Sequence, residues 1–155
     1  MKNEVQVAVL MGSESDREIM EGCIEELEKL GIKCELVVSS AHRQPKATVQ
    51  YVEKALERGA QVFIAGAGMA AALPGFVASL TTRPVIGVPL ASGLPGGIDA
   101  LLAISQMPPG VPVATVAVGK AGARNAAILA AEIISLSDGA VARRLEEMRA
   151  EWRRS

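Results

Sequence analysis

Aromatic side chains are scarce in this chain: among 155 residues there are only four, one Trp, one Tyr and two Phe. Half of the residues are nevertheless hydrophobic, so the core has to be built from Val, Ile, Leu, Ala and Met. Fifteen glycines complete a composition typical of an α/β protein with tight turns. The length suits a single domain with a sizeable core. We therefore expect one domain over residues 1–155, with no internal repeat and no low-complexity segment.

The chain also lacks a large net charge, since its 16 basic and 17 acidic residues nearly cancel. No basic block stands out, which argues against a surface for nucleic acid or membranes. No apolar run reaches the ~18 residues of a membrane span, and the N-terminus has no signal-peptide core. Cys23 and Cys34 lack metal-ligand or CxxC spacing and suit a reducing compartment. The simplest expectation is a cytoplasmic protein.

Histidine occurs only once, at His42. A single histidine and two isolated cysteines argue against a transition-metal site built from protein side chains. Imidazole exchanges protons readily near neutral pH, which suits it to acid–base chemistry. A lone histidine is by itself more often structural than catalytic. The role of His42 therefore has to be inferred from the residues around it.

Apolar, β-branched stretches alternate with amphipathic ones, which predicts a parallel sheet with helices on both faces. Strands are predicted at residues 5–11, 33–39, 61–65, 84–88 and 113–118. Helices are predicted between an S-x-x-E capping box at Ser15 and Gly31, between Pro45 and Gly59, and at residues 76–80, 98–105 and 125–136. Five strands favour a flavodoxin-like, doubly wound three-layer sandwich, whose ligands bind beyond the carboxyl ends of the strands near the switch point.

An extra C-terminal helix is predicted at residues 138–153. Val141, Leu145, Met148 and Trp152 form a narrow apolar stripe on it, and the other positions are crowded with Arg and Glu. Such a stripe either covers the core of its own chain or docks on a neighbouring subunit, and the sequence leaves both open.

A polar loop, Gly-Ser-Glu-Ser-Asp, occupies residues 12–16 after the first predicted strand. Serine hydroxyls and free N–H groups at a helix N-terminus attract phosphate, which makes Ser13 a candidate ligand. A structural interpretation is also open, in which Ser15 caps the helix and Gly12 makes the turn. The two are compatible, because Ser13 is not needed for the cap. Asp16 would repel a phosphate at close range, so a sugar hydroxyl suits it better.

Two further loops follow strands and should therefore lie at the same edge of the sheet. One carries His42 between Ser40 and Arg43, which could hold an anion beside the imidazole. The other contains the glycines of residues 66–68, which match G-x-G-x-x-[GA]. It is not a dinucleotide fingerprint, because it follows the third strand and lacks the acidic residue expected about 20 residues later. Close backbone packing and close approach to a small substrate both remain open for these glycines.

Six motifs occur in the order and spacing of a known family. They are Gly12-Ser13-x-Ser15-Asp16, Ser40-Ala41-His42-Arg43, Ala65-Gly66-Ala67-Gly68 with Leu73-Pro74-Gly75, Val85-Ile86-Gly87-Val88-Pro89, Gln106-Met107-Pro108 and Asn125-Ala126-Ala127. Over residues 5–136 the chain resembles the PurE family, and within it the class I N5-carboxyaminoimidazole ribonucleotide (N5-CAIR) mutases of purine biosynthesis.

The resemblance implies conversion of N5-CAIR to 4-carboxy-5-aminoimidazole ribonucleotide (CAIR) without a cofactor or a metal. The carboxyl group leaves nitrogen as CO₂ held in the pocket and rejoins at ring carbon C4. By motif, His42 is the general acid/base for the C4 proton. Ser13, Asp16 and Arg43 bind the ribose phosphate portion with Ser40 alongside, and Gly68 lets the backbone lie against the imidazole ring or the carboxylate. Family members form octamers, so a homo-octamer is expected.

One motif departs from the family. The usual A-A-H-L-P-G has Ala72 in place of its histidine, so this chain lacks a second imidazole that could position carboxylate or phosphate. This change keeps open a related direct carboxylase, which adds free CO₂ to aminoimidazole ribonucleotide (AIR). Such carboxylases tend to carry S-A-H-K where this chain has Arg43, which favours the mutase. A module that binds phosphoribosyl ligands without turnover is the third alternative.

Overall fold

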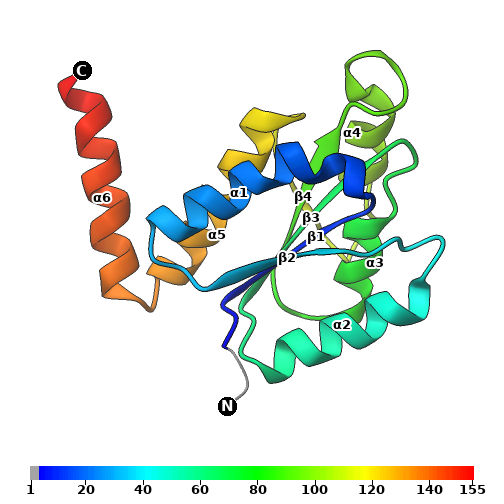
Figure 1. Cartoon of the computed structure of the whole chain (residues 1–155), viewed down its shortest axis with the longest axis horizontal. Helices are drawn as coiled ribbons and strands as arrows, with labels where there is room; N and C mark the ends of the chain where they lie inside the picture. The colour runs from blue at the N-terminus through cyan, green and yellow to red at the C-terminus, as the bar shows by residue number, and fades with distance from the viewer. Residues whose placement is uncertain (1–3) are drawn as a thin grey trace.

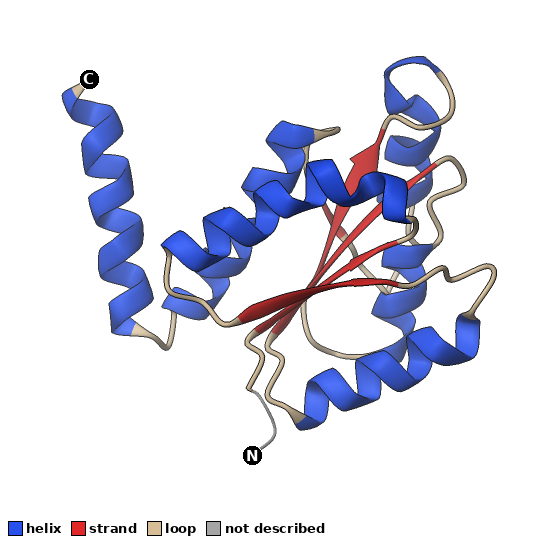
Figure 2. Cartoon of the chain, viewed as in Figure 1, coloured by secondary structure: helices blue, strands red, loops and turns tan. Residues whose placement is uncertain are grey.

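Within residues 4–155, which the computed structural model describes, five parallel strands form a central sheet with helices on both faces (Figures 1 and 2). Residues 1–3 of the predicted domain lie outside the described part. The strands are β1 (Val7–Met11), β2 (Cys34–Val38), β3 (Val62–Gly68), β4 (Val85–Leu90) and β5 (Ala114–Thr115). The helices are α1 (Arg17–Lys29), α2 (Pro45–Glu57), α3 (Leu73–Leu80), α4 (Ile98–Ser105), α5 (Lys120–Ser135) and α6 (Gly139–Arg154), with short 3-10 helices η1 (Glu14–Asp16) and η2 (Pro95–Gly97).

The strands are arranged in the order β2-β1-β3-β4-β5, which confirms the flavodoxin-like order predicted from the sequence. Val9 of β1 is paired with Leu36 of β2 on one side and with Ile64 of β3 on the other. The chain moves outward from β1 to β2 and then returns past β1 to β3. The switch point therefore lies between β1 and β3, whose carboxyl ends meet where Met11 pairs with Gly66.

The side chains of β1 are all buried, as expected for a strand covered on both faces. Because successive residues of a strand point to opposite faces, β1 contributes to two cores. Val7 and Val9 pack in the core with α1 and α5, and Leu10 packs in the core with α2, α3 and α4. Helix α5 presents small buried residues such as Ala127 and Ala130. No helix in the described part combines the length and the apolarity that a membrane crossing requires.

The predicted start of the first helix is wrong. The 3-10 helix η1 comes before α1, and Ser13 is its N-cap, with the Ser13 hydroxyl accepting a hydrogen bond from the Ser15 amide at 3.4 Å. Helix α1 begins only at Arg17, and its N-cap Asp16 makes no side-chain capping bond. Glu14 pairs with Arg17 (3.1 Å from Oε2 to Nη2). The tighter turn moves the cap back, so Ser13 has the structural role that the sequence assigned to Ser15.

Several other boundaries also differ from those predicted. Strand β3 extends to Gly68, because residues 66–68 pair with Val88, Pro89 and Leu90 of β4; these glycines lie in the strand and not in a loop. Helix α3 begins at Leu73, where a proline in the first turn favours helix initiation. Helix α5 begins five residues before the predicted start, at Lys120, and β5 pairs over only two residues. The apolar stretches of the sequence predicted that these helices and strands exist, but contacts with neighbouring elements determine where they begin and end.

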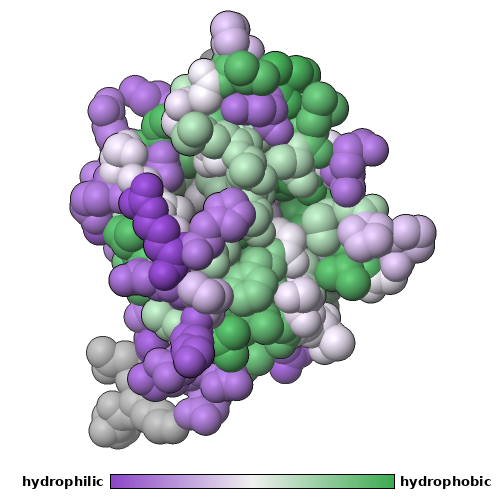
Figure 3. All heavy atoms as spheres, turned by 90° about the vertical axis from the view of Figure 1, so that its right-hand side faces the viewer, coloured by the Kyte–Doolittle hydropathy of each residue, from purple (hydrophilic) through white to green (hydrophobic). Residues whose placement is uncertain are grey.

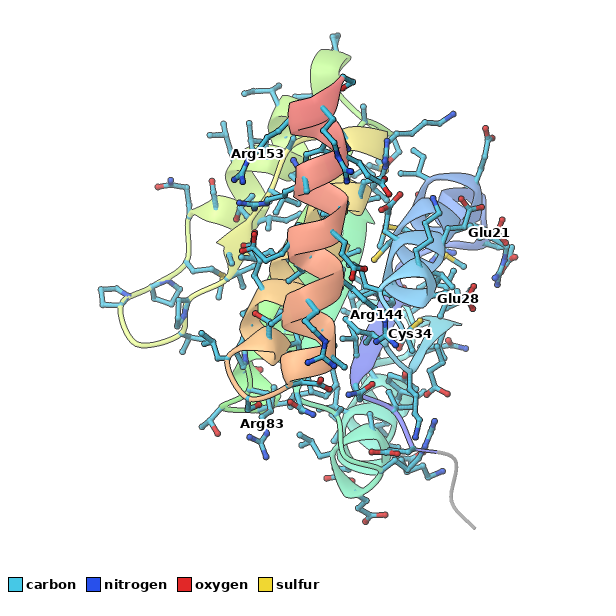
Figure 4. All side chains as sticks on the ribbon, turned by 90° about the vertical axis from the view of Figure 1, so that its left-hand side faces the viewer. Glu21, Glu28, Cys34, Arg83, Arg144 and Arg153 are labelled. Carbon is cyan, nitrogen blue, oxygen red and sulfur yellow. The ribbon has the colours of Figure 1, made fainter. Side chains whose placement is uncertain are left out.

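Helix α6 runs away from the sandwich along the end of α5 (Figure 1). Val141 and Leu145 are buried in the core with α1 and α5, whereas Trp152 is 56% exposed. Arg144 reaches from α6 towards α1 and donates to the Leu30 carbonyl at 3.2 Å, while Arg153 points to the other side (Figure 4). The apolar stripe is thus divided: its first half covers the chain's own core, and its last turn leaves the tryptophan uncovered.

Candidate active site

A pocket of about 500 Å³ opens at the carboxyl edge of the sheet, at the switch point between β1 and β3. Its walls come from the segments that follow β1 and β2, from the end of β3 with the loop after it, and from the loop after β4. The six site residues predicted from the sequence all line it: Ser13, Asp16, Ser40, His42, Arg43 and Gly68. Figure 3 views this side, where most hydrophilic side chains gather along one flank and apolar ones are concentrated towards the middle. The structure thus brings every predicted site residue to one cavity.

The first wall is the turn after β1. The Gly12 amide donates to the Gly66 carbonyl at 3.2 Å, which continues the β1–β3 ladder one step past the strand. The hydroxyls of Ser13 and Ser15 are 2.9 Å apart. Ser13 thus both caps η1 and faces the pocket, so capping does not exclude it from ligand binding.

Asp16 is the buried acidic group of this wall, with 8% of its surface exposed. Burial raises the pKa of its carboxyl, and hydrogen bonding to the Ser13 backbone lowers it in part. Within residues 4–155 no Lys, Arg or His forms an ion pair with it, because the adjacent Arg17 pairs with Glu14 and Glu21 instead. A carboxylate held in this way is suited to accept hydrogen bonds from hydroxyl groups of a ligand.

The second wall is the turn between β2 and α2. The Gln44 amide donates to the Ser40 carbonyl at 2.8 Å and the Arg43 amide donates to Ser40 Oγ at 3.3 Å, which closes the turn. Ala41 packs against the core beneath. His42 and Arg43 are exposed, and within the described chain neither side chain has a hydrogen-bond or ion-pair partner. His42 is therefore not a core residue, and its side chain is accessible to a ligand in the pocket.

The third wall explains the two glycines of β3 differently. A Cβ on Gly66 would lie 2.5 Å from Met20 Sδ, so Gly66 allows α1 to pack closely on the sheet. A Cβ on Gly68 would lie 1.7 Å from Ser92 Oγ and 3.1 Å from the Leu90 carbonyl oxygen. The close-packing interpretation therefore holds for both positions, and only Gly68 also lines the pocket.

The loop after β3 has an unusual backbone. Met69 (φ 55°) and Ala71 (φ 40°) adopt the left-handed conformation that favours glycine. Strain of this kind persists where the surroundings fix it, commonly at ligand sites. Ala72, which replaces the histidine of the usual motif, is the N-cap of α3 and also lines the pocket. The second imidazole is thus absent from the pocket wall itself.

Besides Ser15, to which the sequence gave only a capping role, sequence reasoning missed one more polar residue of the pocket, Ser92. It lies in a Gly- and Pro-containing loop that carries no recognisable motif, and only its position after β4 at the shared sheet edge could have indicated it. Among residues 4–155, no cluster of three or more His, Cys, Asp or Glu side chains could hold a metal ion. A larger hollow of about 760 Å³ lies away from the carboxyl edge, and Arg83 alone among its described lining residues carries a charge.

Fold and pocket together define a flavodoxin-like α/β domain with a polar ligand site at its switch point. The family model for AIR carboxylase matches residues 6–155. The chain belongs to the AIR carboxylase family, which confirms the resemblance to PurE found from the motifs.

Proteins similar to this chain include N5-carboxyaminoimidazole ribonucleotide mutases from several organisms. The relative from Bacillus subtilis is 53% identical over 143 residues, which cover 92% of this chain and 88% of the relative. The relative from Escherichia coli K12 is 48% identical over 147 residues, or 95% of this chain and 87% of the relative. The crystal structure of Treponema denticola PurE superposes with a TM-score of 0.82 at 31% identity, covering 97% of this chain and 94% of that one.

Proposed function

We propose that this chain is an N5-carboxyaminoimidazole ribonucleotide mutase of purine biosynthesis. The C–N bond of the N5 carboxylate breaks, CO₂ stays in the pocket, and a new C–C bond forms at C4. The nitrogen gains a proton and C4 loses one, so the reaction is an isomerisation. The observation that carries the proposal is the convergence of six motif residues on one pocket, in a chain 53% identical to the Bacillus subtilis mutase.

His42 is the general acid/base of this reaction. It lies on the pocket wall, is exposed, and within residues 4–155 its imidazole has no protein partner. A ring in this state can take the C4 proton and return it to nitrogen. General acid–base catalysis of this kind contributes roughly 10²–10⁴-fold in rate. Positioning and exclusion of water have to supply the remaining acceleration.

The ribose phosphate is bound at the ends of β1 and β2. Arg43, whose guanidinium has no ion-pair partner in the described chain, meets the phosphate, with Ser13 and Ser40 supplying hydroxyls beside it. Asp16 accepts hydrogen bonds from ribose hydroxyls, because its buried carboxylate would repel a phosphate. This division anchors the substrate at one end and leaves its ring free to lie beside Gly68 on the pocket wall.

Separate assays of the two substrates test the proposal. Purified protein is incubated with N5-CAIR, or with AIR plus bicarbonate as a source of CO₂, and CAIR formation is measured. We expect efficient turnover only of N5-CAIR. If AIR with free CO₂ is the only substrate that reacts appreciably, the protein is a direct carboxylase, an alternative that Ala72 keeps open. A protein that binds AIR but yields CAIR from neither substrate is a binding module.

The enzyme acts as a homo-octamer in the cytoplasm, without a nucleic-acid or membrane partner. What supports assembly is the last turn of α6, where Trp152 is exposed at the end of a stripe whose other members are buried or half-buried. What supports the location is that Cys23 and Cys34 are both free, as expected in a reducing compartment.

A further inference from the structure

We infer that Ser92 is an additional substrate-binding residue, which donates a hydrogen bond to the migrating carboxyl group and retains it as CO₂ between bond breaking and bond formation. The inference rests on the proposed function and adds a residue that none of the recognised motifs contains. Three observations carry it: the contact between Ser92 and Gly68, the free hydroxyl, and the way the loop around Ser92 is held.

Ser92 Oγ occupies the space where residue 68 would carry a side chain. A Cβ on Gly68 would lie 1.7 Å from Ser92 Oγ and 3.0 Å from Ser92 Cβ, so the hydroxyl sits directly on the Gly68 backbone. This is the part of the pocket where the substrate ring and carboxylate lie in the proposed binding mode. Glycine at position 68 is therefore needed to make room for the Ser92 hydroxyl.

The Ser92 hydroxyl is not engaged by the protein. Within residues 4–155 its Oγ has no hydrogen-bond partner, although the Ser92 amide donates to the Leu90 carbonyl at 3.0 Å. The other serines of the pocket differ: Ser40 Oγ accepts from the Arg43 amide, and the hydroxyls of Ser13 and Ser15 bond to each other. A hydroxyl can donate to a carboxylate, which only accepts. Ser92 can thus supply a donor that the nearby apolar wall, residues 69–73, does not supply from its side chains.

Asp99 of α4 fixes the loop that carries Ser92. Its Oδ2 accepts the Leu94 amide at 3.1 Å, and a Cβ on Gly93 would lie 2.2 Å from that oxygen and 3.1 Å from Met69 Cγ. The loop after β4 is therefore clamped between α4 and the loop after β3. Asp99 is a positioning residue, since it holds the backbone next to Ser92 and does not line the pocket.

Removal of the Ser92 hydroxyl should therefore allow CO₂ to escape from the pocket during the reaction. During transfer the carbamate C–N bond breaks and its electron pair goes to nitrogen. Neutral CO₂ then lies in the pocket for a short time without a covalent bond to the substrate. If CO₂ escapes at that point, nitrogen takes up a proton and the products are AIR and CO₂ in place of CAIR. The group is charged as the carboxylate on nitrogen and again as the carboxylate on C4, and a hydrogen bond to a charged group contributes enough that its loss should lower the rate of CAIR formation about 10- to 100-fold.

The test is a Ser92→Ala variant assayed with N5-CAIR, in which CAIR and AIR are both quantified against an enzyme-free blank. We expect kcat for CAIR to fall about 10- to 100-fold and a larger share of consumed N5-CAIR to appear as AIR. Affinity for AIR, which lacks the carboxyl group, should stay within about twofold of wild type, because the ribose phosphate contacts remain. Ser105→Ala, an exposed serine at the end of α4 outside the pocket, is the matched control.

Asp99→Asn provides a second, independent variant. It weakens the clamp without touching the pocket, so we expect the same shift towards AIR in smaller measure, and it serves as the test if Ser92→Ala does not fold. The inference is overturned if every variant that folds forms CAIR and AIR in the same ratio as wild type. It is also overturned if Ser92→Ala loses as much affinity for AIR as it loses in kcat. If wild-type protein forms no CAIR from N5-CAIR, the proposed function itself fails, which is a separate outcome.

Discussion

Two carboxylates at neighbouring strands of the same sheet differ in their partners and in the direction of their pKa shifts. Glu35 of β2 accepts from Arg58 at 2.9 and 2.7 Å and from the Tyr51 hydroxyl at 2.8 Å. The Arg58 guanidinium lowers the pKa of Glu35, and burial raises that of Tyr51. Asp16, after β1, forms no ion pair within residues 4–155, and burial raises its pKa. Glu35, Arg58 and Tyr51 use their hydrogen-bonding groups on one another and stabilise the fold. The Asp16 carboxylate keeps hydrogen-bonding capacity for a ligand.

The pocket side of this comparison is tested most strongly by His42→Asn. We expect turnover of N5-CAIR to fall roughly 10²–10⁴-fold, because the proton at C4 loses its acceptor. Folding and AIR binding should be retained, since the imidazole is exposed and forms no hydrogen bond or ion pair with the described residues. Turnover is measured by CAIR formation and binding by calorimetry.

Gln50→Ala, an exposed substitution on α2 outside the pocket, is the control for this variant. Unchanged turnover in His42→Asn would remove His42 from the mechanism.

The structural side is tested by Glu35→Gln. Loss of the charged hydrogen bonds to Arg58 should lower the free energy of unfolding by about 1–3 kcal/mol, with kcat unchanged. The lowered pKa of Glu35 means that its ionised form is favoured by folding. Its contribution is complete above the unfolded pKa of about 4.3 and is lost as the pH falls through the lower folded value. The difference from wild type in denaturant titrations should therefore be largest at neutral pH and disappear in strong acid.

Glu53→Gln, exposed on α2, is the matched control and should have no measurable effect on stability. A Glu35 variant that loses activity but keeps its stability would reverse the assignment of the two carboxylates.

Asp16→Asn should act in the opposite direction on stability. Because burial raises the pKa of Asp16, ionisation opposes folding above the folded pKa and ceases to matter below the unfolded value of about 3.9. The amide should raise the stability of the free protein by about 0.5–2 kcal/mol at neutral pH. The gain should shrink as the pH falls, while affinity for AIR decreases. A variant that is less stable than wild type at neutral pH would show that the carboxylate is structural.

A smaller effect is expected at α6, whose stripe shows the same contrast between satisfied and open groups. Met148→Ala combined with Trp152→Ala removes the less buried half of the stripe, and we expect the oligomer to loosen in sedimentation experiments while each subunit stays folded. Val141→Ala, in the buried half, should instead destabilise the fold. A double variant that remains fully assembled and equally stable would show that the stripe is not an intersubunit contact.

Much of the fold and site could be predicted because strand ends in a parallel sheet share one edge. That geometry alone brings Ser13, His42 and Gly68 together from distant parts of the chain. The bounds of α4 at Ile98–Ser105 were also predicted correctly, and the structure shows that Gly97 precedes the helix in a left-handed conformation.

What the sequence could not predict depends on tertiary pairing. The S-x-x-E pattern at Ser15 looks like a capping box, but a 3-10 helix before α1 moves the cap to Ser13. Gly66 and Gly68 look like loop residues until β4 pairs with them. Ser92 has no pattern around it, and only its contact with Gly68 gives it meaning.

The central claim is that the carboxyl group moves within one substrate molecule in this pocket. N5-CAIR carrying a carbon-13 label in its carboxyl group is converted by the enzyme in the presence of unlabelled bicarbonate, and the label in the product is measured by mass spectrometry. The account predicts that CAIR retains the label. If the carboxyl carbon of CAIR comes from the unlabelled bicarbonate pool, CO₂ enters from solution and the mutase mechanism is wrong.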